Sequence, residues 1–262
     1  MSAMDFREAY GPYALVVGGS DGLGLAFAEA IARRGVNLVL VARQEERLLA
    51  AADRLRSVFQ IDVIPITADV AQYDEVEALI DAVPEQIGLL VYNVAFAPIG
   101  LFQEQTPEQL ALAADVNVRA PLLLVRHLVT PMIQRGRGGI VLMSSMLGAQ
   151  GCTNFATYGA TKSFAATLAE ALWSELKPHN VDVLACIAGA ILTPGHEQAG
   201  RSKPVPGSLP PDTVAELTLS ALGKGPVVIP GSVNKVWHFM LSRILSKRTA
   251  IKIMSKNTAN MA

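Results

Sequence analysis

Three residues near the middle of the chain have the types and spacing that acid–base chemistry at a carbonyl group requires. Tyr158 and Lys162 are four positions apart at the start of a helical stretch, so their side chains project from one face. Ser145 lies thirteen residues before Tyr158, directly after an apolar run. A free tyrosine has a pKa of about 10, and a nearby ammonium should lower it. A tyrosine beside an ammonium can act as a general acid or base, and a serine hydroxyl can donate a hydrogen bond to a reacting oxygen.

A glycine-rich turn near the start of the chain is typical of a phosphate-binding loop. It follows an apolar run and opens into a segment where Leu23, Phe27 and Ile31 recur at helical spacing. Glycines let backbone amides approach a pyrophosphate, and the N-terminus of a helix favours its negative charge. The turn predicts a dinucleotide site with candidate contacts at Gly18, Ser20, Asp21, Gly22, Leu23 and Gly24.

The residues that follow the second apolar run predict which dinucleotide is preferred. An NAD site places Asp or Glu there to bind the ribose hydroxyls, whereas this chain has Ala42 and Arg43. A guanidinium forms bidentate hydrogen bonds with phosphate, which suits the additional phosphate of NADP. Arg43 therefore favours NADP(H), with NAD(H) as the alternative.

The glycine-rich turn also fits the G-x-S-x-G pattern of an α/β hydrolase, with Ser20 as the nucleophile. A hydrolase elbow normally follows several strands, whereas this turn follows the first apolar run. The histidine partner would come later in the chain, where His238 is the last candidate. The dinucleotide interpretation is favoured, and the hydrolase stays as an alternative.

The elements that must position these groups are short apolar runs separated by helical patterns. Runs that are continuously apolar predict strands covered on both faces, as in a parallel sheet between helices. We therefore expect one Rossmann-type, doubly wound α/β domain over residues 1–262. Its seven expected strands are 14–17, 38–41, 63–66, 89–92, 140–143, 183–187 and 227–229.

Taken together, these motifs resemble the short-chain dehydrogenase/reductase family over nearly the whole chain. The residues that match the family pattern, in order and spacing, are Gly18, Gly22, Gly24, Asp69, Val70, Asn93, Asn117, Ser145, Tyr158, Lys162, Gly189 and Thr193. The resemblance implies an oxidoreductase that interconverts a ketone or aldehyde and an alcohol. It implies catalytic roles for Ser145, Tyr158, Lys162 and Asn117.

The resemblance also implies how the cofactor and a water are held. Lys162 would bind the cofactor ribose, and Asn117 would fix a water that links Lys162 to solvent. Further cofactor contacts would come from Asp69, Val70, Asn93, Tyr158, Gly189, Ile191 and Thr193. The chain departs from the family pattern at Val17, where Thr is usual, and at Ala188, where Pro is usual. The N-N-A-G segment has become Tyr92-Asn93-Val94-Ala95.

The turn and the second apolar run look most like the branch of 3-ketoacyl thioester reductases and 17β-hydroxysteroid dehydrogenases. This implies a hydrophobic substrate, either a 3-ketoacyl thioester or a steroid-like ketone. A different class of function stays open, namely a catalytically silent NADPH-binding or redox-sensing protein. The intact Ser145, Tyr158 and Lys162 argue against that alternative.

Composition excludes several other classes. The chain is 51% hydrophobic and 17% charged with a net charge of -1, which excludes disorder and gives no overall field for nucleic acid. Cys152 and Cys186 form no CxxC pair, and the four histidines lack metal-ligand spacing, so we expect no metal. The N-terminus carries charges where a secretory signal needs an apolar run. We expect a cytoplasmic protein.

Three segments predict contacts beyond the catalytic centre. The helix over 158–176 is apolar on nearly every side, so one side should cover the sheet and the other should meet another subunit in a homodimer or homotetramer. The Pro- and Gly-rich segment 193–212 is expected to be a substrate lid. The basic, amphipathic segment 233–256 would cover the substrate cleft, contact an anionic membrane, or bind an acidic substrate tail such as coenzyme A, with the first favoured.

Overall fold

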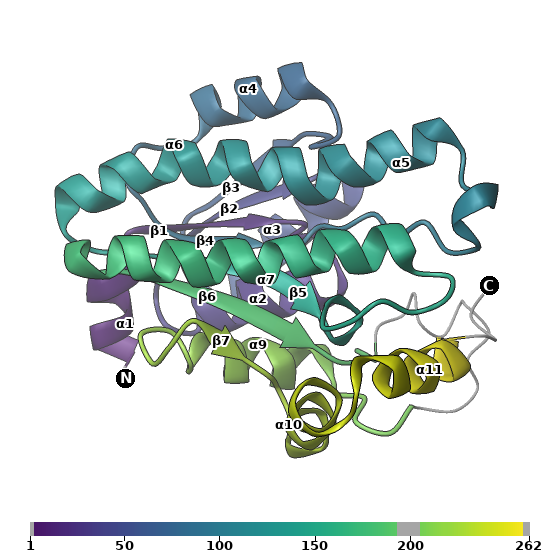
Figure 1. The fold of residues 1–262 in the computed structure, drawn as a ribbon. Coiled ribbons are helices and arrows are strands. Elements are labelled where there is room, and N and C mark those ends of the chain that lie inside the picture. The colour runs from purple at the N-terminus through teal and green to yellow at the C-terminus, as the bar shows by residue number, and fades with distance from the viewer. Residues whose placement is uncertain (1–2, 193–204, 259–262) are drawn as a thin grey trace.

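A parallel sheet of seven strands forms the centre of the molecule (Figure 1). The computed structural model describes residues 3–192 and 205–258. The strands lie in the order β3-β2-β1-β4-β5-β6-β7, and every neighbouring pair is parallel. Their bounds are β1 Tyr13–Val17, β2 Asn37–Ala42, β3 Val63–Thr67, β4 Ile87–Tyr92, β5 Gly138–Ser145, β6 Val181–Ala188 and β7 Val227–Val228. The expected doubly wound α/β fold is confirmed, although β7 ends one residue before the predicted Ile229.

Helices cover both faces of the sheet (Figure 1). One face carries α2 (Gly22–Ala32), α3 (Glu45–Phe59) and α9 (Pro211–Leu219). The opposite face carries α4 (Tyr73–Ala82), α6 (Ala120–Arg135) and α7 (Ala156–Leu176). The remaining α-helices are α1 (Ala3–Tyr10), α5 (Pro107–Ala114), α10 (Ser232–Phe239) and α11 (Lys247–Thr258). Within these described residues, each helix is too short or too polar to cross a membrane.

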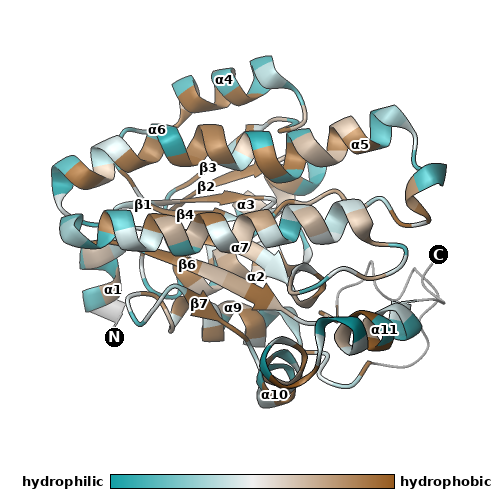
Figure 2. Cartoon of the chain, viewed as in Figure 1, coloured by the Kyte–Doolittle hydropathy of each residue, from teal (hydrophilic) through white to brown (hydrophobic). Residues whose placement is uncertain are grey.

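Burial of the strands explains their continuous apolar runs. Every residue of β4 is buried, as are the four central residues of β2. Figure 2 shows that the strands of the sheet are mainly hydrophobic. Successive side chains of a strand point to opposite faces, so apolar residues are needed at each position when both faces are covered. Many of the apolar residues of the chain therefore lie in the sheet and on the helix faces packed against it.

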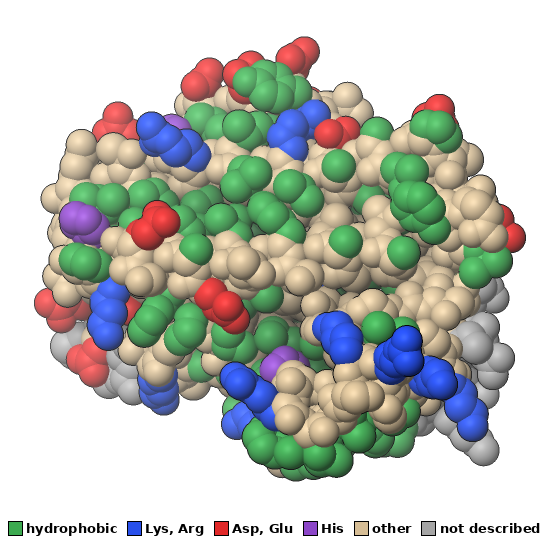
Figure 3. Space-filling view, viewed as in Figure 1, with side chains coloured by type: hydrophobic (Ala, Val, Ile, Leu, Met, Phe, Trp, Pro, Cys, Tyr) green, Lys and Arg blue, Asp and Glu red, His purple; other side chains and the backbone are tan. Residues whose placement is uncertain are grey.

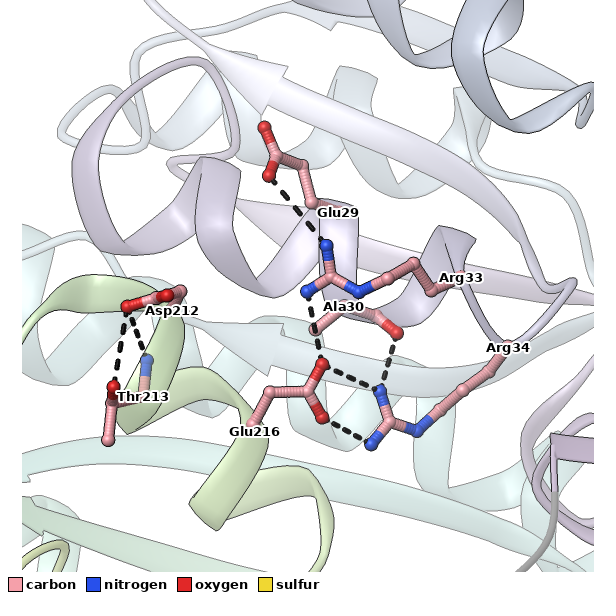
Figure 4. Close-up of polar contacts among 7 residues, drawn as sticks. All are labelled: Glu29, Ala30, Arg33, Arg34, Asp212, Thr213 and Glu216. Atoms are coloured by element: carbon pink, nitrogen blue, oxygen red, sulfur yellow. Dashed lines mark hydrogen bonds and ion pairs between the residues drawn. The ribbon is translucent and has the colours of Figure 1, made fainter.

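An ion-pair cluster fixes α9 against the end of α2 (Figure 4). Glu216 accepts hydrogen bonds from Arg34 at 2.6 Å and from Arg33 at 3.0 Å, and Arg34 also donates to the Ala30 carbonyl at 2.6 Å. The hydrogen bond from Arg34 is the main cause that lowers the pKa of Glu216. The cluster holds α9, which lies between β6 and β7 in the sequence, against the helix that follows β1, although β1 and β6 are not neighbours in the sheet.

The N-terminal helix is anchored by a buried phenol. Tyr10 donates a hydrogen bond to a carboxylate oxygen of Asp182 in β6 at 2.6 Å, and its ring meets Phe6 edge to face. Both aromatic side chains are fully buried. Burial and the carboxylate together raise the pKa of Tyr10, so the phenol stays protonated as the donor.

We expect Tyr10→Phe to lower the free energy of unfolding by about 2 kcal/mol, because it removes a charge-assisted hydrogen bond from a partly buried carboxylate. Tyr13→Phe is the matched control, since the Tyr13 hydroxyl lies at 3.4 Å from Asp62 on the surface. Its expected cost is below about 0.5 kcal/mol. Urea denaturation of the two variants measures both values. Equal losses would show that the contact with Asp182 contributes nothing particular.

Candidate active site

A cavity of about 320 Å³ opens at the carboxyl ends of the strands. Its walls come from the ends of β1 and β2 and from the segments that follow β3 and β4. The strand order reverses between β1 and β4, and ligands of open α/β sheets bind at such a switch point. Five of the predicted cofactor residues line this cavity, namely Gly18, Ser20, Arg43, Asp69 and Val70. Asp21 caps α2, whose first turn contains Gly22, Leu23 and Gly24, and Asn93 follows β4.

The glycine turn lies between β1 and α2 with backbone packed on backbone. Gly18 has a φ of +84°, and a Cβ on Gly24 would lie 1.7 Å from the Gly18 carbonyl oxygen, so both positions require glycine. The Asp21 carboxylate accepts the Gly22 amide at 2.7 Å and caps the helix. The turn therefore brings the N-terminus of α2 to the edge of the cavity, where its field favours an anion.

Two arginines line the cavity where the sequence predicted one. Arg43 follows β2, and Arg47 lies one helical turn later on α3. Arg47 is also 3.8 Å from the Asp21 carboxylate. Sequence reasoning missed Arg47, although a second arginine four positions after Arg43 at the start of a helix is a usable signal. The cavity thus presents two exposed guanidinium groups and no carboxylate at the end of β2.

Ser145, Tyr158 and Lys162 come together where β5 meets the first turns of α7. Ser145 ends β5, and its hydroxyl accepts the Leu147 amide at 3.2 Å and hydrogen bonds with Tyr158. Lys162 is buried, and its Nζ donates to the Met143 carbonyl at 2.8 Å and lies 5.6 Å from the Tyr158 ring centroid. The three groups predicted from sequence spacing are therefore neighbours in space.

Two glycines that sequence reasoning missed allow this grouping. A Cβ on Gly148 would lie 2.8 Å from the Lys162 carbonyl carbon, and one on Gly159 would lie 2.8 Å from the Leu147 carbonyl oxygen. The short helical turn Met146–Gly148 therefore packs directly on the backbone of α7. Gly159 directly follows Tyr158, which is the signal that could have identified it. These close approaches place the turn that follows Ser145 directly against the helix that carries Tyr158.

Burial controls the protonation of the two ionisable groups. Burial raises the pKa of Tyr158, and the hydrogen bond with Ser145 opposes part of that rise. This direction is opposite to the sequence-based expectation of a lowered pKa at Tyr158, because burial is the largest cause of the shift. Burial also lowers the pKa of Lys162 to about 8. Tyr158 is accordingly a neutral proton donor at neutral pH.

Asn117 lies in a π-helical turn, Asp115–Arg119, between α5 and α6. Its amide accepts from the Phe96 amide at 2.8 Å and donates to the Phe96 carbonyl at 2.7 Å and to Thr161 at 3.0 Å. Such π-turns are frequent at functional sites. A cavity of about 10 Å³ between Asn117 and Lys162 is about the size that holds one water. The bridging water stays a prediction.

The remaining predicted residues follow β6. Gly189 packs on Asn234 of α10, and Ile191 pairs with Leu209 in a short parallel bridge. Neither lines the cavity at the end of β1. Thr193 and most of the predicted lid, residues 193–204, lie outside the described residues.

Comparison with known proteins identifies the family of the chain. A family model for short chain dehydrogenases matches residues 12–203. The 7beta-hydroxysteroid dehydrogenase of Clostridium sardiniense is 30% identical over 237 residues, which cover 88% of this chain and 90% of that protein. The inactive hydroxysteroid dehydrogenase-like protein 1 of Mus musculus is 32% identical over 228 residues, with 85% and 69% covered.

Solved structures agree with the fold. One of a 7beta-hydroxysteroid dehydrogenase superposes with a TM-score of 0.90 at 28% identity, covering 95% of this chain and 98% of the other. A short-chain dehydrogenase from Sphingobium yanoikuyae in complex with NADPH gives a TM-score of 0.79 at 32% identity, covering 86% and 91%. The chain belongs to the short-chain dehydrogenase/reductase family, whose members are oxidoreductases that act on CH–OH and C=O groups.

Proposed function

We propose that the protein is an NADP(H)-preferring oxidoreductase that interconverts a bulky, apolar ketone and its alcohol. The observation that carries the proposal is the grouping of Ser145, Tyr158 and Lys162 at the end of β5. Tyr158 is the acid in reduction and the base in oxidation, Ser145 orients the carbonyl oxygen, and Lys162 and Asn117 support them. These four roles require only proton transfer and hydrogen bonding by side chains that are already positioned.

The residues present fit a bound NADP(H), which supplies the hydride that adds to the carbonyl carbon. The glycine turn and the N-terminus of α2 suit the pyrophosphate, and the cavity takes the nucleotide beside them. Arg43 and Arg47 suit the additional phosphate of NADP, because each guanidinium can form two parallel hydrogen bonds. Asp69, Val70, Asn93, Gly189 and Ile191 are proposed as further contacts.

The protonation states of the site suit the reduction step. As negative charge builds on the substrate oxygen, Tyr158 donates its phenolic proton to it. Ser145 accepts the Leu147 amide, so its hydroxyl proton can turn from the Tyr158 oxygen to the substrate oxygen. Lys162 uses one of its N–H groups on Met143, which leaves two for the cofactor ribose. In the oxidation direction, Tyr158 accepts the proton of the alcohol.

A hydrophobic ketone is the substrate class that the relatives favour. Two of the matched proteins are named as a 7beta-hydroxysteroid dehydrogenase and a very-long-chain 3-oxoacyl-CoA reductase, and these names refer to a hydroxysteroid and to a very-long-chain 3-oxoacyl thioester. We propose a steroid-like ketone or a 3-ketoacyl thioester for this chain.

A second candidate is a catalytically silent NADPH-binding protein, because the hydroxysteroid dehydrogenase-like relative is named as inactive. Such a protein would bind NADPH without reducing any carbonyl substrate. The hydrolase interpretation of Ser20 is set aside by the family membership.

We place the whole chain in one nucleotide-binding domain. We also place the protein in the cytoplasm, which suits its two free cysteines, Cys152 and Cys186.

We also propose a homodimer or homotetramer formed through α7 and its neighbour α6. The outer side of α7 is half-exposed rather than buried within one chain, with Leu168, Leu172 and Trp173 on it. Hydrophobic side chains gather along the α6–α7 face of the molecule (Figure 3). Leu122 on α6 is 41% exposed. A contiguous apolar face of this kind suits a subunit interface.

Tyr158→Phe should lower NADPH-dependent reduction of ketones by at least about a hundredfold, because it removes the proton donor. The assay is NADPH oxidation against a panel of steroid ketones and 3-ketoacyl thioesters, with NADPH binding followed by fluorescence. Binding should be unchanged, and the control Tyr13→Phe should retain full activity. Turnover that survives in Tyr158→Phe contradicts the mechanism, and a wild-type chain that binds NADPH but reduces nothing supports the silent alternative.

Arg43→Ala together with Arg47→Ala should lower kcat/KM for NADPH by about tenfold to a hundredfold, because charge-assisted hydrogen bonds to one phosphate are lost. Turnover with NADH should change little, since NADH lacks that phosphate. Arg54→Ala, on the same helix but paired with Glu29, is the control. Parallel losses with both cofactors would remove the basis for an NADP preference.

Leu122→Arg should shift the protein towards the monomer in size-exclusion chromatography with light scattering, because a charge is costly in an apolar interface. Leu49→Arg on α3 is the matched control, as Leu49 is 43% exposed on the opposite face of the sheet. It should leave the assembly unchanged. A wild-type protein that is monomeric at all concentrations contradicts the proposed interface.

A further inference from the structure

The charges of the chain are divided unevenly between its two parts. The last acidic residue is Glu216, so residues 217–262 carry none of the 23 acidic residues. They carry seven of the 22 basic ones, which are Lys224, Lys235, Arg243, Lys247, Arg248, Lys252 and Lys256. The net charge of -1 therefore conceals a strongly basic C-terminal part and an acidic remainder.

The same part of the chain exposes an apolar surface. We define the C-terminal apolar patch as Val233, Val236, Trp237, Phe239 and Ile244, which lie on α10 and the π-helical turn Met240–Ile244 and are 44% to 62% exposed. Asn234 and Leu241 are the buried residues that attach this segment. The patch forms the lower edge of the molecule in Figure 3, beside basic side chains. Its exposure shows that these side chains do not pack over the described fold.

Charge distinguishes between two partners for this surface, a second copy of the chain and a lipid bilayer. A symmetric contact between two copies would bring two basic segments together, because each copy presents the same surface to the other. An anionic bilayer instead supplies negative headgroups for the lysines and arginines and an interfacial region for Trp237 and Phe239. Basic residues next to exposed aromatic and aliphatic side chains are the pattern of a helix that lies in the interface of a membrane.

We propose that the C-terminal apolar patch and the basic residues around it form a peripheral binding surface for anionic lipid bilayers. The apolar side chains enter the headgroup region, and the basic side chains contact the headgroups. The helices stay parallel to the membrane plane and do not span it.

The position of this surface links it to the candidate active site. Ser255 accepts the Thr153 amide at 3.0 Å, and Thr258 donates to the Thr153 carbonyl at 2.9 Å, so α11 holds the segment between Ser145 and Tyr158. On α10, Asn234 packs against Gly189 after β6. The binding surface therefore lies at the catalytic edge of the sheet. If the proposed function holds, an apolar ketone can enter the site from the bilayer.

Vesicle sedimentation of the full chain tests the proposal. Binding is compared between vesicles of phosphatidylcholine alone and vesicles that also contain phosphatidylglycerol. We expect binding to the anionic vesicles only, weakened by added salt. Val236→Glu should weaken it by more than about tenfold. Val58→Glu on α3 is the matched control, because Val58 is 61% exposed and Val236 is 62% exposed and both variants introduce the same charge.

Tryptophan fluorescence gives an independent readout of the same contact. The chain has two tryptophans, Trp173 and Trp237, so Trp173→Phe leaves Trp237 as the reporter. Its emission should shift to shorter wavelength with anionic vesicles and stay constant with neutral ones. Reduction of a water-soluble ketone by Val236→Glu should match the wild type, which shows that the variant is folded.

Four outcomes would overturn the proposal. The first is no binding to anionic vesicles, and the second is equal binding by Val236→Glu and Val58→Glu. The third is loss of self-association in Val236→Glu without any vesicle binding, which would assign the patch to a second copy. Binding of coenzyme A thioesters without vesicle binding would assign the basic residues to a substrate tail and also overturn it. Absence of carbonyl reduction in the wild type bears on the proposed function alone.

Discussion

The candidate site depends on a buried ammonium group. Taking the charge of Lys162 out of water is unfavourable, and its lowered pKa expresses that cost. The Met143 carbonyl on β5 accepts its Nζ, and the Ser144 hydroxyl donates to its backbone carbonyl. Both contacts exist only while α7 lies against β5, so the charge and the helix position support each other. Tyr158, one turn earlier on the same helix, is placed by that packing.

The nucleotide side of the cavity is governed by a different constraint, the close approach of backbone to backbone. Gly18 and Gly24 can touch because neither has a side chain. The same condition recurs at Gly148 and Gly159, where the turn after β5 meets α7. Parallel strands end at one edge of the sheet, so both close contacts lie at that edge. One follows β1 and the other follows β5, on either side of the strand-order reversal between β1 and β4. A phosphate-binding turn and a proton donor can thereby act on one ligand.

The C-terminal part differs from the rest of the chain in charge and in exposure. The sheet and its helices bury their apolar residues and carry the acidic side chains, whereas α10 and the turn after it display apolar residues beside basic ones. Within this segment Leu241 is buried, whereas Val236, Trp237 and Ile244 are exposed. A periodic pattern specifies an amphipathic helix, but only the attachment through Asn234 decides which side meets the protein.

The sequence determined the strands and the order of the motifs, because continuous apolar runs and glycine turns are local signals. It also predicted that Ser145, Tyr158 and Lys162 would meet, since strand ends share one edge and a four-residue spacing shares one helix face. Only the tertiary structure decided that Arg47 joins Arg43, that Gly148 and Gly159 bring the turn onto α7, and that the pKa of Tyr158 rises. Those outcomes depend on burial and on contacts between distant segments, neither of which a local pattern contains.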